Sequence, residues 1–240
     1  MPNPYGLIIF LAIISSLYIV KLFVNKKDEE IFWGLALYTL LCGLIGARLY
    51  HVLNFFSYYI ANPLKIFEIW GGGIGIWGAF LGGALGAIFY LKYKKQNVPY
   101  WLDLISVSLP LAQAVGRWGN FFNQEIFGLP TNLPWGIYIK PENRPQGLRN
   151  FATFHPLFLY ESLLDLVLFC ILFSLYKRYK DRVDKGVFTA IYLGSYSIIR
   201  FFLEYLRINP WKIAGLNVSQ CISILVLAFS IVFIRKKAIK

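Results

Sequence analysis

Seven apolar runs, most of them about twenty residues long, follow one another along the 240-residue chain with polar segments between them. A helix of that length crosses the hydrocarbon layer of a membrane, and the alternating ten-residue pattern of a β-barrel is missing from the sequence. The hydrophobic fraction of 58% and the mean hydropathy of +0.56 lie outside the usual range of soluble proteins. The sequence therefore predicts an all-α integral membrane protein with seven transmembrane helices, which form a single polytopic membrane domain over residues 1–240.

The basic residues predict how these helices are oriented. Of the 24 Lys and Arg residues, fifteen lie in the clusters that follow the first, third, fifth and seventh runs. Alternate connections lie on the same side of a membrane, and the side rich in Lys and Arg is the cytoplasmic one. We expect the N-terminus outside and the C-terminus in the cytoplasm. The net charge of +12 is thus explained by topology, and no nucleic acid is expected as a partner.

A long polar segment, residues 124–154, separates the fourth run from the fifth. It is rich in proline, glycine and asparagine and shows little periodicity, so we expect an arm outside the membrane. In the third run, Gly75, Gly78, Gly82 and Gly86 recur at steps of three and four, and this spacing favours close packing against another helix. The triplet Gly71–Gly73 precedes that run and could present backbone amides to an anion.

Three polar residues at the end of the fourth run, Arg117, Asn120 and Asn123, recur every third residue and form one stripe on a helix. A guanidinium with nearby amides suits a phosphate or carboxylate, since it holds two oxygens at once and stays charged in poor solvent. A structural pair between Arg117 and Glu125 fits the same residue types, which leave both interpretations open.

Further polar residues are expected at the outer ends of other spans, near this stripe. They include Arg48, the segment His155 to Glu161, and Arg200 with Glu204. Three arginines at that depth would form an electropositive cavity suited to a lipid phosphate, and they could stabilise the charge of a phosphate that leaves its ester. An ionic lattice that only ties helices together is the alternative. A phospholipid-binding scaffold or flippase would use the same cavity without breaking bonds.

The run Gly116-Arg117-xx-Asn120-Phe-xx-Asn123-x-Glu125-xx-Gly128 resembles the signature of the prolipoprotein diacylglyceryl transferase family. Supporting segments occur along the whole chain in the same order: Tyr5-Gly6, Gly46-Ala47-Arg48 with Asn54, the Trp70 to Gly73 segment, His155-Pro156 with Tyr160-Glu161, and Arg200 with Glu204 and Arg207. The resemblance implies an enzyme of the bacterial cytoplasmic (inner) membrane. Its members transfer the diacylglyceryl group of phosphatidylglycerol to the thiol of the lipobox cysteine in a prolipoprotein signal peptide and release glycerol phosphate. No metal or soluble cofactor is implied.

The resemblance also assigns roles by position. Arg117 is expected to bind the phosphatidylglycerol head group, Arg200 to stabilise the departing phosphate, and Glu204 to orient Arg200 or Arg207. The other expected site residues are Asn120, Asn123, Glu125, Gly128, Arg48, Tyr5 and Tyr160.

One position departs from the family pattern. Many members have histidine where this chain has Trp77, and an indole neither accepts a proton nor titrates usefully. His155 and His51 are the remaining candidates for a base. We expect the acceptor thiol to be activated chiefly by the positive field of the arginines, since cationic neighbours lower the pKa of a thiol.

Overall fold

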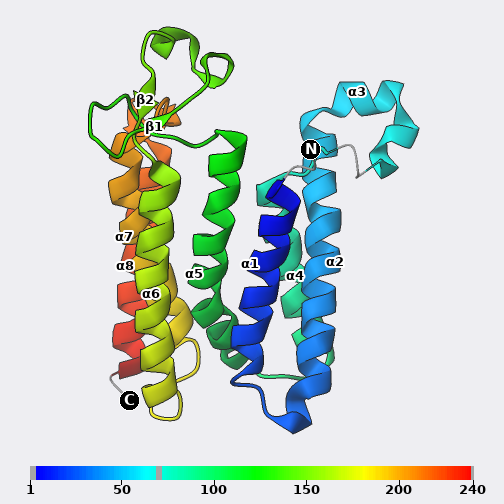
Figure 1. Ribbon diagram of the computed structural model, residues 1–240. Coiled ribbons are helices and arrows are strands. Elements are labelled where there is room, and N and C mark those ends of the chain that lie inside the picture. The colour runs from blue at the N-terminus through cyan, green and yellow to red at the C-terminus, as the bar shows by residue number, and fades with distance from the viewer. Residues whose placement is uncertain (1–3, 69–71, 239–240) are drawn as a thin grey trace. The chain divides into compact units, whose positions relative to one another are not determined.

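The computed structural model describes residues 4–68 and 72–238. Within these residues, seven helices are long and apolar enough to cross a membrane, which confirms the predicted number of spans. They are α1 (Pro4–Lys21), α2 (Glu29–Asn54), α4 (Ile76–Tyr93), α5 (Val98–Asn123), α6 (Leu157–Tyr179), α7 (Val187–Leu203) with the 3-10 turn η6 (Glu204–Leu206), and α8 (Val218–Ala238) (Figure 1).

The connections contain shorter elements. The helix α3 (Phe56–Ala61) and the 3-10 turn η2 (Pro63–Phe67) follow α2, and η1 (Lys26–Asp28) precedes it. Two antiparallel hairpins, which the sequence did not predict, are formed by β1 (Ile137–Tyr138) with β2 (Thr153–Phe154) and by β3 (Lys212–Ile213) with β4 (Leu216–Asn217). Strands of two residues are too short to show an alternating pattern in a sequence.

The chain divides into two compact units, which are described separately. Unit 1 comprises Met1–Leu22 and Pro99–Lys240, and unit 2 comprises Phe23–Val98. Unit 2 is built on the packing of α2 against α4. A β-carbon at Gly46 would lie 2.3 Å from the carbonyl oxygen of Gly78, and one at Gly82 would lie 2.3 Å from that of Cys42. Only glycine permits this approach of two backbones, so the predicted role of the glycine series in helix packing is confirmed.

Unit 1 holds α1 and α5 to α8. Polar contacts hold α5 against its neighbours inside this apolar unit. The hydroxyl oxygen of Ser16 on α1 lies 2.7 Å from that of Ser108 on α5. The Ser162 hydroxyl on α6 donates to the Ala114 carbonyl of α5 at 2.8 Å. The helix α7 packs between α6 and α8. Buried polar groups are costly unless they are paired, and these pairs therefore fix which helix faces meet.

The start of α7 is capped from another helix. Gly186 precedes α7 with φ of 97°, a conformation that favours glycine. The buried carboxylate of Asp103, on α5, accepts the Gly186 amide at 2.7 Å, and the Thr189 amide and hydroxyl at 2.8 and 2.9 Å. These bonds satisfy amides that the first turn of a helix leaves free, and they place a negative charge at its positive end.

Replacing Asp103 with alanine is therefore expected to lower the free energy of unfolding by about 2 kcal/mol, the upper range for loss of a helix cap. The stability of the purified protein in detergent, followed by circular dichroism during heating, measures this loss. Asp103→Asn keeps an acceptor oxygen and should recover part of it. An alanine variant as stable as the parent would contradict a capping role.

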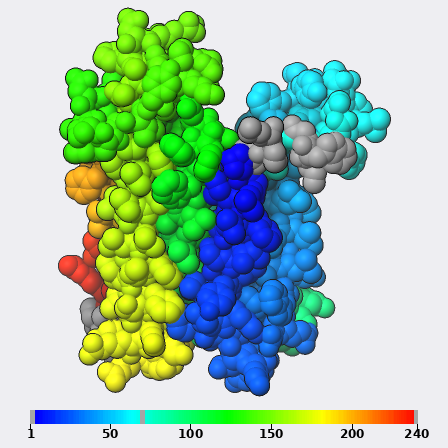
Figure 2. All heavy atoms as spheres, in the orientation of Figure 1, coloured from blue at the N-terminus to red at the C-terminus, as the bar shows by residue number. Residues whose placement is uncertain are grey.

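The arm from Gln124 to Pro156 lies over one end of unit 1, and in the space-filling view it covers that end of α6 (Figure 2). The Gln124 side chain accepts the Lys140 amide and the Asn143 side-chain amide, both at 3.0 Å. The β1–β2 pair closes the base of the arm, with Ile137 opposite Phe154. The arm thus has a defined structure and lies beside the ends of the helices that carry the candidate site.

Candidate functional site

One buried carboxylate, Glu161, joins three helices of unit 1. It lies in the second turn of α6 and is only 2% exposed. Its Oε1 accepts from Arg117 Nη2 of α5 at 2.5 Å and from the Tyr196 hydroxyl of α7 at 2.9 Å, while its Oε2 accepts from Arg200 Nη1 of α7 at 3.3 Å. Arg117 and Arg200, 83 residues apart in the sequence, are thus held by one acid.

A second buried carboxylate, Glu204, extends the set. Its Oε2 accepts from Arg200 Nη2 at 3.2 Å and lies 3.5 Å from Arg207 Nη1. The two arginines that flank Glu204 in the sequence are therefore both held by it, whereas the family resemblance implied this for Arg200 or Arg207. We call Arg117, Glu161, Arg200, Glu204 and Arg207 the arginine cluster.

The arginine cluster contains three guanidinium groups and two paired carboxylates, which leaves one positive charge in excess. The carboxylates are almost completely buried, whereas the side chains of Arg117 and Arg200 are each 21% exposed and that of Arg207 is 40% exposed. The acids therefore lie beneath the guanidiniums and orient them, while the guanidiniums keep an accessible edge. Such an edge can bind two oxygens of a phosphate.

The two asparagines in the last turn of α5 pair with a different carboxylate, that of Glu125. Glu125 Oε1 accepts from Asn120 Nδ2 at 3.1 Å and from Asn123 Nδ2 at 3.2 Å, and the Glu125 amide donates to the Asn120 carbonyl. The alternative pairing of Arg117 with Glu125 is wrong, because Arg117 pairs with Glu161. The carboxylate of Glu125 instead fixes both asparagine side chains beside Arg117.

Gly128 is the point where the arm meets the end of α7. Its amide donates to the His155 carbonyl at 2.9 Å, and the next amide, of Leu129, donates to the Leu206 carbonyl at 2.8 Å. A β-carbon at Gly128 would lie 2.9 Å from both the His155 β-carbon and the Leu206 carbonyl oxygen. Only glycine allows the arm to lie this close to Arg207, with which Gly128 forms a β-bridge.

Three side chains form a polar chain on the arm side of α6. The Trp135 indole donates to the Tyr160 hydroxyl at 2.8 Å, and this hydroxyl lies 3.1 Å from Nδ1 of His155. The predicted site residues Tyr160 and His155 are therefore neighbours. Tyr160 is also next to Glu161 in the sequence, so these three hydrogen-bonded side chains adjoin the arginine cluster.

Tyr5 of α1 packs on α5 beside the same stripe. A β-carbon at Gly119 would lie 2.7 Å from the Tyr5 ring, so the ring covers the backbone next to Asn120. Unit 1 thus brings together all the predicted site residues that belong to it: Tyr5, Arg117, Asn120, Asn123, Glu125, Gly128, His155, Tyr160, Arg200, Glu204 and Arg207.

The predicted site residues of unit 2 have other partners. The buried Arg48 donates to the backbone carbonyls of Lys65, Ile66, Glu68, Gly72 and Gly73. Gly72 and Gly73 have positive φ and direct their carbonyls at the guanidinium, whereas Trp70 and Gly71 lie outside the described residues. The ring of His51 lies 4.6 Å from that of Phe55. Arg48 thus organises the loop before α4, and its role toward a lipid stays a prediction.

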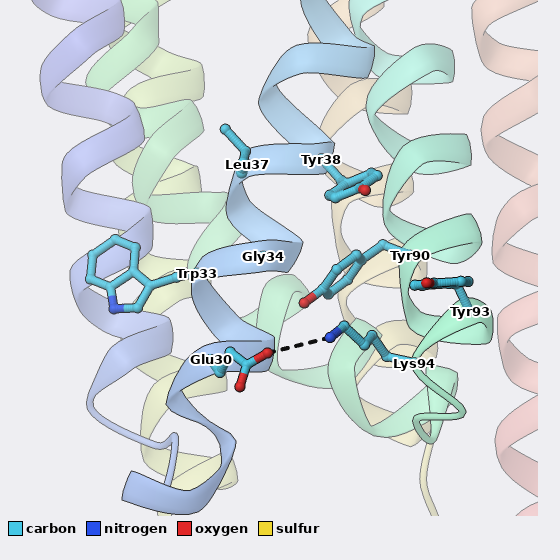
Figure 3. Close-up of a pocket in the computed structure, with 8 residues that line it drawn as sticks. All are labelled: Glu30, Trp33, Gly34, Leu37, Tyr38, Tyr90, Tyr93 and Lys94. Carbon is cyan, nitrogen blue, oxygen red and sulfur yellow. Dashed lines mark hydrogen bonds and ion pairs between the residues drawn. The ribbon is translucent and has the colours of Figure 1, made fainter.

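A cavity of about 580 Å³ opens between the far ends of α2 and α4 in unit 2 (Figure 3). Aromatic side chains line it, and the Lys94 ammonium donates to the Glu30 carboxylate at 3.3 Å across it. This bond raises the pKa of Lys94. Glu30 and Arg48 are eighteen residues apart on one helix, a distance of about 27 Å. The cavity is therefore separate from the loop that Arg48 organises.

The sequence interpretation missed two polar residues of unit 1. Tyr196 lies four residues before Arg200 and donates to Glu161, and Asp165 lies four residues after Glu161 and is completely buried. The signal was present, because polar residues inside apolar runs at a helical spacing from a site residue lie on the same face.

The chain is similar to known proteins over most of its length. A model of the family described as prolipoprotein diacylglyceryl transferase matches residues 3–235. The phosphatidylglycerol–prolipoprotein diacylglyceryl transferases of Trichormus variabilis and of a Nostoc species are 40% and 38% identical to the chain, over 92% and 97% of its length and 80% and 86% of theirs. That of Thermotoga maritima is 37% identical over 91% of this chain and 75% of its own. The chain therefore belongs to the prolipoprotein diacylglyceryl transferase family and is a multi-pass membrane transferase of lipoprotein biosynthesis.

Proposed function

We propose that the arginine cluster binds the phosphate of phosphatidylglycerol while the thiol of a prolipoprotein lipobox cysteine attacks the adjacent carbon of the diacylglycerol. The new sulfur–carbon bond forms as the carbon–oxygen bond to phosphate breaks, and the electron pair leaves with glycerol phosphate. The thiol proton is lost to solvent. The supporting observation is that Arg117 and Arg200, from separate helices, are oriented by the single buried carboxylate of Glu161.

The charge of the cluster explains how it would accelerate this step. A phosphodiester carries one negative charge, and the leaving phosphate gains a second as the bond breaks. Fixed guanidiniums that already face this position stabilise the added charge without reorganising, and their effect is largest where water is excluded. The same field would favour the thiolate, whose unperturbed pKa is about 8.5. The tyrosines and asparagines around the cluster then shape the space for the head group.

The expected orientation places this site on the outer side of the bacterial inner membrane, with the N-terminus outside. In unit 1 the arm lies at one end of the helices, and the basic ends of α6 and α8 lie at the other (Figure 1). The arginine cluster is at the arm end, because Glu161 lies near the start of α6 and Arg200 in the last turn of α7. Lys237, at the basic end, pairs with Asp184 at 3.5 Å. This separation supports the orientation inferred from the positive-inside rule. An outer site is accessible to the lipobox cysteine of a signal peptide held in the membrane.

The direct test incubates the purified protein with phosphatidylglycerol and a lipobox peptide. We expect mass spectrometry to detect the diacylglyceryl thioether and free glycerol phosphate in equal amounts. The same peptide with serine in place of cysteine should give neither product. A scaffold or flippase would bind or move the lipid without forming a thioether, and a hydrolase would release glycerol phosphate with the serine peptide as well.

Removal of the His155 side chain tests whether a histidine base is needed. We expect His155→Ala to keep transfer within about tenfold of the parent, below the 10²–10⁴-fold effect of a general base, because the ring contacts the Tyr160 hydroxyl at the edge of the cluster. Initial rates of thioether formation across pH 6 to 9 measure this. His51→Ala serves as the second variant. A loss of three or more orders of magnitude in either folded variant would contradict activation by the arginines alone.

A further inference from the structure

Asp165 is a buried acid that the proposed mechanism does not use. It is 0% exposed, and neither carboxylate oxygen has a hydrogen-bond partner among the described residues. It lies four residues after Glu161 on α6, and therefore one turn away on the same face. Because Asp165 is enclosed by protein, a ligand bound to the arginine cluster does not touch it. Any influence on that ligand must come from its charge.

The groups around Asp165 determine whether its carboxyl group is charged or neutral. The charged and titratable ones come from α5, α6 and α7: Arg117, Glu161, Tyr192, Tyr196 and Arg200. The two tyrosine hydroxyls donate elsewhere, that of Tyr192 to Gln113 at 3.1 Å and that of Tyr196 to Glu161. Both arginines are paired with glutamates.

An ionised Asp165 would therefore have a high electrostatic cost. A carboxylate without hydrogen bonds in a dry interior is destabilised by several kcal/mol, and the neighbouring charge of Glu161 adds repulsion. The protonated acid avoids both costs. Glu161 has two arginines and a tyrosine as partners, whereas Asp165 has no hydrogen-bond partner among the described residues and therefore keeps its proton.

The proton on Asp165 decides the total charge of the site. With Asp165 neutral, the arginine cluster keeps one positive charge in excess, which equals in magnitude the single negative charge of a phosphodiester. With Asp165 ionised, the excess is cancelled. We propose that Asp165 is a specificity-determining residue that is neutral when lipid binds and thereby selects a singly charged anionic head group over a zwitterionic one. This inference rests on the proposed function of the cluster as the lipid phosphate site.

The test compares the affinity of wild type and Asp165→Asn for short-chain phosphatidylglycerol and phosphatidylcholine between pH 6 and pH 9.5, by calorimetry in detergent. The phosphodiester stays singly charged over this range. For the wild type, the preference for phosphatidylglycerol should fall by about tenfold as pH rises, the effect of one elementary charge about 12 Å away at an effective dielectric constant of about 20. For Asp165→Asn, which cannot ionise, the preference should stay constant with pH. Asp165→Leu provides a second uncharged variant if the asparagine protein does not fold.

Three results would overturn the inference about Asp165, two of them from the pH dependence. One is a wild-type preference that does not change with pH, and the other is a decline of the same size in the uncharged variants. A loss of phosphatidylglycerol binding by Asp165→Asn at every pH would also exclude it, because it would mean that the carboxyl group contacts the ligand. The proposed function fails separately, if the wild type shows no preference for phosphatidylglycerol at pH 6.

Discussion

Replacing Arg117 with lysine is expected to reduce the rate of diacylglyceryl transfer by two to three orders of magnitude, about the effect of removing one oriented donor from a charge-stabilising site. Lysine keeps the positive charge but not the planar fork, and it cannot contact both Glu161 and a phosphate with fixed geometry. The Arg117–Glu161 contact of 2.5 Å shows that one arm of the fork is already in use. Initial rates of thioether formation in phosphatidylglycerol vesicles, at matched amounts of inserted protein, measure the effect.

Arg182→Lys is the matched control, because Arg182 is exposed and follows the C-terminal end of α6, whereas Glu161 lies near the start of that helix. This control should transfer at the parental rate. If Arg117→Lys remains within threefold of the parent, the guanidinium serves only to tie α5 to α6, and the lipid phosphate must be bound elsewhere.

The seven helices and the Arg200–Glu204 pair of the site could be predicted from local sequence patterns. Run length is enough to predict seven spans, and a step of four residues is enough to pair Arg200 with Glu204, because both follow from the geometry of a single helix. Arg117, Asn120 and Asn123 have carboxylate partners within the protein, and the anion-binding role expected of this stripe stays a prediction. The arm was also expected between the fourth and fifth spans, and the structure has it there.

The partner of Arg117 could not be predicted in this way. Glu125 is near Arg117 in the sequence, whereas Glu161 is 44 residues away. Glu161 is nevertheless the carboxylate that Arg117 contacts, because α6 packs against α5. Helical periodicity predicts which residues share a face, and it does not predict which helix that face meets. Arg48 shows the same limit: its spacing indicated a polar face, whereas its partners are loop carbonyls, and sequence patterns carry no signal for carbonyl direction.

Replacing Glu161 with glutamine is expected to have the largest effect on stability, since this residue holds two arginines and a tyrosine. Glutamine has nearly the same shape but no charge, so Arg117 and Arg200 would lose their shared counter-ion. Breaking a buried ion pair by removing one partner typically costs about 3–5 kcal/mol. We expect a loss of stability of that size in detergent, measured by chemical denaturation, and a fall in transfer of at least about a hundredfold. Glu142→Gln, an exposed acid of the arm, is the control and should change neither.

Lipid rescue would show whether the lost stability comes from uncompensated charge at the proposed phosphate site. In Glu161→Gln the excess positive charge of the arginine cluster rises from one to two, so an anion bound there compensates more charge than in the parent. A ligand that binds only the folded state stabilises it in proportion to the logarithm of its concentration over its dissociation constant. Phosphatidylglycerol should therefore stabilise the glutamine variant more than the parent, and phosphatidylcholine should not. Equal stabilisation of both proteins by phosphatidylglycerol would mean that the lipid phosphate does not bind at the guanidiniums that Glu161 orients, and the mechanism proposed for this transferase would lose its site.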